Sequence, residues 1–281
     1  MDFGLSIKFY IYTGSGKIRG VKMKQLERAI ISLGITIILS ACSDINSENL
    51  LTSGICAEIN VSNKPTNGLR VYTTLSSNCG LFADRIELTN GDTLTTTYAG
   101  TNTILGKSGQ TWSGDLAYAA NIPGYLDGSP LTVGLTRTGE GADAPNSTVT
   151  LPYGFSVTGT FSDSYLPSDT LNIAWTENDG TAPRPAEVTV SVRCSMSSYN
   201  AQTGEFDTDI DSNSTTLTRV PPFTVALGPL INGLASGFDE DCQGSIEIGR
   251  MNTGTRDPAL HGGSSIKAKY GFNHTFYFYR I

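Results

Sequence analysis

The chain has 281 residues, the length of two ordinary domains or of one large β domain. Charged residues make up only 16%, well below the usual quarter, and small polar residues and 31 glycines fill the positions that lysine and glutamate hold on helix surfaces. This composition argues against a mainly helical protein. The net charge of −7 offers no basic surface for a nucleic acid, so we expect no nucleic-acid partner.

The N-terminal residues contain an export signal. From Met23 a short basic segment is followed by an uncharged apolar run that ends at Leu39. A basic segment, an apolar segment and small residues before a break are the three parts of a secretory signal peptide. The apolar run is too short to span a bilayer, which takes about 20 residues. We therefore predict a cleaved signal over residues 23–41, and we assign residues 1–22 to a misplaced start site.

The end of this signal reads Leu-Ser-Ala-Cys at positions 39–42, which resembles the lipobox of bacterial lipoproteins. In that box the cysteine is acylated and begins the mature chain, so the resemblance implies that Cys42 carries the lipid. Buried methylenes contribute about 0.8 kcal/mol each, so several acyl chains hold such a protein at a membrane. Ser43 follows the cysteine, which in lipobox proteins favours the outer membrane, at its periplasmic face or the cell surface. We expect residues 42–54 to form a flexible tether.

Four more cysteines follow in a chain exported to a compartment where disulfides persist. Three pairings are possible, and pairing of neighbours, Cys56 with Cys79 and Cys194 with Cys242, keeps each bridge within one expected domain. In the chain-entropy model these bridges would contribute about 3 and 4 kcal/mol. A metal site is the competing interpretation, but no two of these cysteines have the spacing of a zinc knuckle, and the chain has only two histidines.

Alternation of apolar and polar residues, the period of β-strands, dominates the rest of the chain. Residues 86–98 alternate on both sides of Asn90 and Gly91, a dipeptide typical of two-residue turns, so a hairpin is predicted there. Further strands are expected at residues 131–135, 171–175, 188–194, 223–227, 246–248 and 274–279. No segment after residue 44 has an apolar stripe at helical spacing, so the mature chain is predicted to be all-β.

A domain boundary is predicted near Pro152, between two runs of strand-forming residues. The two halves resemble each other weakly, because Arg137 and Arg250 each follow an apolar strand and precede a loop with Gly, Asp and Pro. Short strands separated by turn signals suit β-sandwiches. We therefore predict two tandem immunoglobulin-like sandwiches, over residues 55–152 and 153–281.

Four short runs carry a resemblance to a known family. They are Gly-Asp-Thr-Leu-Thr at 91–95, Ala-Pro-Asn-Ser-Thr-Val-Thr-Leu-Pro at 144–152, Leu-Asn-Ile-Ala-Trp at 171–175 and Gly-Ser-Ser-Ile-Lys-Ala at 263–268. These runs resemble those of uncharacterised two-domain lipoproteins of Gram-negative bacteria, and the likeness covers most of the mature chain. It implies an envelope location and a two-domain fold. That family has no assigned activity, so the resemblance implies no mechanism.

Acidic residues at alternate positions form one candidate metal site. Asp207, Asp209, Asp211 and Asn213 place oxygen ligands two residues apart, as calcium-binding loops do. The pattern lacks the turn glycine and the final glutamate of the EF-hand. The competing interpretation is a solvated acidic loop between strands. Calcium is the one cofactor that the sequence brings into consideration, and otherwise we expect none.

Candidate catalytic groups are few. His261 lies in a Gly-rich loop and His274 on an aromatic strand, and the mature sequence contains no nucleophile elbow, zinc-binding helix or phosphate-binding loop. We therefore predict a non-catalytic, lipid-anchored envelope protein, either a structural module or one whose sandwich loops bind a protein or a glycan. The alternative is a calcium-supported, glycosidase-like hydrolase, which needs carboxylates that converge in a cleft.

Overall fold

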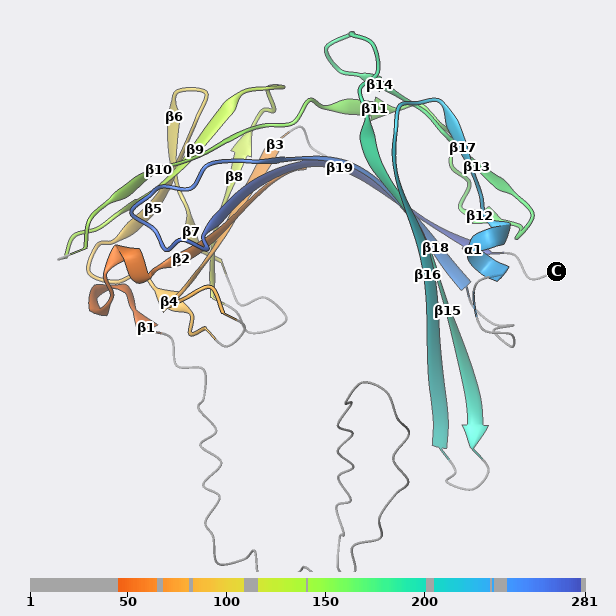
Figure 1. The fold of residues 1–281 in the computed structure, drawn as a ribbon, viewed down its shortest axis with the longest axis horizontal. Helices are drawn as coiled ribbons and strands as arrows, with labels where there is room; N and C mark the ends of the chain where they lie inside the picture. Colours follow the sequence, from red (N-terminus) through yellow and green to blue (C-terminus); the bar gives the residue numbers. More distant parts are fainter. Residues whose placement is uncertain are drawn as a thin grey trace, which may run out of the picture. The chain divides into compact units, whose positions relative to one another are not determined.

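Short strands make up most of the described chain (Figure 1). The computed structural model describes residues 45–64, 68–80, 83–108, 116–139, 141–200, 205–232, 234 and 242–278. Helical structure in these residues is limited to two 3₁₀ turns, Ser47–Asn49 and Thr52–Gly54, and to α1 (Gly228–Asn232). The predicted all-β class is confirmed. The signal segment and Cys42 lie outside the described residues.

The largest sheet contains strands from both halves of the chain. Its strands are hydrogen-bonded in the order β16-β15-β18-β19-β2-β3-β8-β7, and β12 also pairs with β19. The strands are β2 (Cys56–Lys64), β3 (Gly68–Ser76), β7 (Gly106–Ser108), β8 (Ala117–Pro123), β12 (Ser164–Tyr165), β15 (Ala186–Asn200), β16 (Glu205–Arg219), β18 (Cys242–Thr253) and β19 (Ser265–Phe278). Strand β19 pairs in parallel with β2 and antiparallel with β18, so the two halves of the sheet meet at β19.

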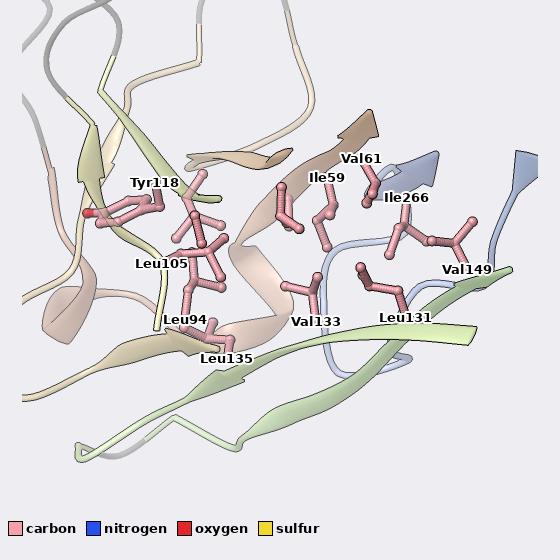
Figure 2. Packing of buried hydrophobic residues seen from close by; sticks show 14 of the residues in the cluster. Ile59, Val61, Leu94, Leu105, Tyr118, Leu131, Val133, Leu135, Val149 and Ile266 are labelled. Carbon is pink, nitrogen blue, oxygen red and sulfur yellow. The ribbon is translucent and has the colours of Figure 1, made fainter. Parts of the chain in front are cut away.

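A four-stranded sheet packs against the β2 side of the large sheet and forms a sandwich with it. Its order is β10-β9-β5-β6, with the strands β5 (Thr93–Tyr98), β6 (Thr101–Ile104), β9 (Pro130–Thr136) and β10 (Ala144–Thr150). Alternate residues of β5 and β9 are buried, and most of them are apolar, as the period-two pattern predicts. Figure 2 shows Leu131 and Val133 of β9 facing Ile59, Val61 and Ile266 of the large sheet. This interface is the first hydrophobic core.

The second hydrophobic core lies against β15, β18 and β19. Two short antiparallel pairs contribute to it, β11 (Phe155–Val157) with β14 (Trp175–Glu177) and β13 (Thr170–Ile173) with β17 (Phe223–Ala226). The predicted strand 171–175 is therefore divided at Ala174, whose carbonyl accepts hydrogen bonds from a neighbouring loop. On the closing strand, Phe276 is fully buried in this core while the next residue, Tyr277, is exposed.

The two cores divide the chain near residue 152, except at three positions. Leu260, Ile266 and Ala268 pack in the first core although they lie in the second predicted range. Strand β19 therefore supplies side chains to both cores. The division into separate domains over 55–152 and 153–281 stays a prediction.

The predicted hairpin around Asn90 and Gly91 is wrong in its pairing. The turn itself is present, with φ values of 53° and 88° at these residues, which the Asn-Gly dipeptide tolerates. However, β4 (Ile86–Glu87) pairs in parallel with β1 (Ile45–Asn46), whereas β5 pairs with β6 and β9. The dipeptide determines the local turn, but burial of β5 in the first core determines its partners.

Among the described glycines, Gly254 leaves the least room for a side chain. A Cβ there would lie 2.0 Å from the carbonyl oxygen of Thr148, and Gly254 donates a backbone hydrogen bond to Ile266. We expect Gly254→Ala to lower the free energy of unfolding by about 1–3 kcal/mol, because backbone atoms must move. Urea denaturation followed by circular dichroism measures this change. Gly106→Ala is the matched control, since its Cβ would meet nothing within 4 Å, and equal losses in both variants would contradict the argument.

Candidate binding surface

A buried carboxylate fixes the loop that follows β14. The side chain of Glu177 has no exposed surface, and Arg250 of β18 donates two hydrogen bonds of 2.7 Å to its two carboxylate oxygens. Arg184 donates to the same carboxylate from its backbone, at 2.9 Å, and from its guanidinium, at 3.0 Å. Bidentate arginine–carboxylate pairs of this kind are directional as well as strong. Glu177 therefore fastens residues 178–185 to β18.

The guanidinium of Arg250 uses its full set of N–H donors. Besides its two bonds to Glu177, it donates to the backbone carbonyls of Tyr153, Arg184 and Pro185. It also lies over the ring of Phe155, 5.0 Å from the centroid. A guanidinium has five N–H groups, and all five are engaged here. This residue therefore acts as a fixed link between three segments.

The charge state of Glu177 follows from these contacts. Burial by itself raises the pKa of its carboxyl group, but hydrogen bonds from Arg250 and Arg184 outweigh that effect. The pKa of Glu177 therefore lies below its ordinary value, and the group is ionised at neutral pH.

The first half of the chain contains a second buried ion pair between an arginine and a carboxylate. Arg137 forms an ion pair with Asp92 at 2.7 Å, and both side chains are almost completely buried. Arg137 also donates to the carbonyls of Ser47 and Leu50, which fastens the N-terminal 3₁₀ turn to the first core. The expectation of a flexible tether is therefore wrong for residues 45–54, where Ser47 and Thr52 are buried. The two arginines that mark the weak sequence repeat thus both pair with a buried carboxylate, Arg137 directly after β9 and Arg250 within β18.

An open groove lies along strands β15, β16, β18 and β19 and includes Arg250 in its lining. Its cavity volume is about 510 Å³. It is lined by Pro185, Ala186, Glu187, Thr189, Thr218, Glu247, Gly249, Arg250, Met251, Asn252 and Lys269. Most of these side chains offer hydroxyl, amide, carboxylate or ammonium groups. Met251, which is 60% exposed, is the large apolar side chain among them.

Two glycines facing each other explain why the sheet is open here. Gly249 of β18 pairs directly with Gly271 of β19, so neither strand places a side chain at this point. The aliphatic part of Lys269 covers the pair, and its ammonium group forms an ion pair with Glu247. Gly249 belongs to the lining of the groove, so a side chain there would occupy part of its floor.

The carboxylates of the groove are open to solvent. Glu187 is exposed, and Glu247 and its partner Lys269 keep 46% and 50% of their side-chain surface in solvent. The groove therefore presents charged and hydrogen-bonding groups at the surface. The alternative of a glycosidase-like hydrolase stays a prediction.

The predicted calcium-binding segment lies in a strand, so the expectation of a loop is wrong. Asp207, Asp209, Asp211 and Asn213 belong to β16, which pairs residue by residue with β15. The alternating Val and Thr residues of β15 form a long strand. Strand β16 is hydrogen-bonded to one edge of it, and β18 to the other. The amide of Asn213 donates to the carbonyl of Leu230 in α1, at 3.0 Å. Calcium binding by these residues stays a prediction.

The cysteines after residue 44 form two disulfides, Cys56 with Cys79 and Cys194 with Cys242. The Cα atoms are 5.4 Å and 4.1 Å apart. The second bridge joins residues directly opposite each other on β15 and β18, and the first ties the start of β2 to the loop after β3. Each bridge therefore links strands that already contribute to one core.

The two histidines have different surroundings. His274 stacks on Phe161, with ring centroids 5.4 Å apart, and its Nε2 lies 3.1 Å from the carbonyl oxygen of Ser162. His261 lies against the first disulfide, with its Nδ1 3.2 Å from Sγ of Cys79. Within the described residues, no helix is both long and apolar enough to cross a membrane.

Comparison of the sequence with protein-family models and with curated proteins finds no match. Among solved structures, the chain is similar to the full ectodomain of mouse nectin-like molecule 4, which contains Ig1–Ig3. The two are 12% identical with a TM-score of 0.25, and the match covers 81% of this chain and 65% of that one. A likeness this distant carries no argument about function. The all-β sandwich is established by the strand pairing itself.

The Glu177 ion pair makes a testable contribution to stability. Because its folded pKa lies below the ordinary value of 4.5, the contribution is present above about pH 4.5 and is lost as the pH falls through the folded pKa. We expect Glu177→Gln to lower the free energy of unfolding at pH 7 by about 3–5 kcal/mol, since Arg250 loses its carboxylate partner and Arg184 keeps only its ion pair with Asp179. The variant should also lose less stability than the wild type on acidification.

Denaturation curves between pH 3 and pH 7 measure both effects. The matched control is Glu187→Gln, which removes an exposed carboxylate and should change stability by no more than about 0.5 kcal/mol. If the free energy of unfolding falls equally with pH in the wild type and in Glu177→Gln, the loss of stability in acid does not come from Glu177.

Proposed function

We propose that the mature chain is a lipid-anchored, non-catalytic protein of the bacterial outer membrane that binds an envelope protein or a glycan. The anchor is proposed from the Leu-Ser-Ala-Cys sequence at 39–42, at the end of the signal segment. The acidic net charge disfavours contact with anionic lipid headgroups, so the lipid on Cys42 would hold the protein at the membrane while its surfaces remain free.

The observation that supports a binding role is the polar groove on β15, β18 and β19. Its floor is a hydrogen-bonded sheet, and the buried pair of Glu177 and Arg250 fixes the loop at its rim. A site held rigid before binding loses little conformational entropy when a partner docks. The carboxylates, hydroxyls and amide of the groove match the hydrogen-bonding groups of sugars and of polar peptide segments.

The anchor is tested by mass spectrometry of the membrane fraction. We expect the mature N-terminus to be an acylated Cys42, and Cys42→Ala to release the protein into the soluble fraction, because the fold itself has little affinity for lipid. An unmodified Cys42, or a mature chain that retains residues 23–41, would contradict the proposed anchor.

The binding role is tested by recovery of partners from detergent-solubilised envelope with immobilised protein. We expect Met251→Arg to weaken capture at least about tenfold, equivalent to ~1.4 kcal/mol, because a long cation then occupies the groove. Ile104→Arg is the matched control, since Ile104 is also an exposed apolar strand residue, at 66%, and lies outside the groove. Partners captured equally by both variants would locate the binding surface elsewhere, and no specific capture by the wild type would favour a purely structural role.

A further inference from the structure

The first disulfide, together with His261, brings three metal-ligating side chains into one cluster. Cys56 is buried at the start of β2, while its partner Cys79 is exposed. The two Sγ atoms and the Nδ1 atom of His261 all lie within 4.8 Å of one another. Because the three residues are far apart in the sequence, no spacing motif could have linked them.

Backbone hydrogen bonds hold His261 at this place. Its N–H donates to the carbonyl of Ile55, at 3.0 Å, which is the residue directly before Cys56. The carbonyl of His261 accepts from the N–H of Ser264, at 2.9 Å, and the hydroxyl of Ser264 accepts from the N–H of Ala57, at 3.0 Å. The histidine is therefore fixed to the same strand as the buried cysteine.

Gly263 allows the loop to pass over the sulfur atoms. A Cβ at this position would lie 2.6 Å from Sγ of Cys79, closer than any real Cβ contact. The N–H of Gly263 donates to Nδ1 of His261, at 3.1 Å. An acceptor nitrogen carries no proton, so the ring proton is on Nε2, and the lone pair of Nδ1 accepts the bond from Gly263. That atom is the one that faces Cys79.

We propose that reduction of the Cys56–Cys79 bond converts this cluster into a Zn²⁺ site, with both thiolates and Nδ1 of His261 as ligands. Two sulfurs and one imidazole are a common ligand set for zinc. In a tetrahedral site with Zn–S of about 2.3 Å and Zn–N of about 2.0 Å, sulfur and nitrogen lie about 3.5 Å apart. The present distance of 3.2 Å between Cys79 and His261 is close to that value. Since Cys79 is exposed, water can take the fourth position.

A dithiol is the reductant in this conversion. The dithiol supplies two electrons and two protons, the bond between the two sulfurs breaks to give two thiols, and the reductant becomes a disulfide. Zn²⁺ then displaces both thiol protons into solvent, and the N–H of Gly263 gives up its bond to Nδ1. A disulfide oxidant that accepts two electrons from the two thiolates reverses these steps: the bond between the two sulfurs forms again, the oxidant becomes a dithiol, and the metal is released. The bridge and the metal are therefore alternative occupants of one site.

The experiment compares zinc binding by the oxidised and the reduced protein. The purified chain is reduced with a phosphine, freed of reductant without oxygen and titrated with Zn²⁺ by calorimetry, and sulfur-to-metal absorption of Co²⁺ reports the thiolate ligands. We expect one Zn²⁺ per reduced chain and none per oxidised chain. Cys79→Ser should abolish binding, whereas Cys194→Ser should leave it unchanged.

The histidine variants form a matched pair. We expect His261→Gln to weaken Zn²⁺ binding at least about tenfold, and His274→Gln to leave it unchanged. Equal binding by wild type and His261→Gln, equal binding in both redox states, or no binding by the reduced chain would each overturn the proposal. Near-UV circular dichroism follows the fold, and a reduced chain that unfolds without recovery on adding Zn²⁺ would also overturn it.

Discussion

Strand β19 has to satisfy two hydrophobic cores at once, and the rest of the structure depends on this constraint. Its first residues place Ile266 and Ala268 in one core, and its last residues place Phe276 in the other. It is hydrogen-bonded along its length to β18 and over its first part to β2. A slip of one residue would turn the side chains at both ends toward the wrong face. The register of this strand is therefore fixed by both halves of the chain together.

Buried ion pairs fasten loops to this framework. Arg137 with Asp92, and Arg250 with Glu177, each place a guanidinium where several backbone carbonyls converge. Arg250 of the second pair also belongs to the lining of the groove. Hydrogen bonds to the arginine hold such a loop in one conformation, so it does not need a helix packed beneath it. The same feature thus contributes to stability and shapes the proposed binding surface.

The sequence was sufficient to predict some of the strands, among them β9 and β15, and the turn at Asn90, because these follow from local patterns. Strands β2, β3 and β8 were not predicted. The apolar residues of β9 and β15 alternate as a half-buried strand requires, and Asn90 with Gly91 forms the expected turn. Pairing across long separations is not a local property, so the partners of β5 could not be predicted. The acidic alternation in β16 has the same period as a strand, which explains why it could be read as a calcium-binding loop.

The groove and the cluster at His261 could not be predicted for a similar reason. The glycine pair that opens the groove belongs to two strands whose register is set by the fold, and neither Gly249 nor Gly271 is unusual in sequence. The weak repeat of Arg137 and Arg250 was a usable signal, since both residues prove to be buried and paired. Their carboxylate partners, Asp92 and Glu177, lie earlier in the chain and do not belong to the repeated pattern.

The parallel pairing of β2 with β19 also determines when β2 gains its second neighbouring strand during folding. Ala57 and Ser264, which are hydrogen-bonded beside this pair, are 207 residues apart. A chain that is made from its N-terminus therefore exposes one edge of β2 until almost all of it has emerged. Until then the first core lacks Ile266 and Ala268, and closing so long a loop is slow. During that interval the unpaired edge of β2 is the surface that a chaperone would have to shield from other chains.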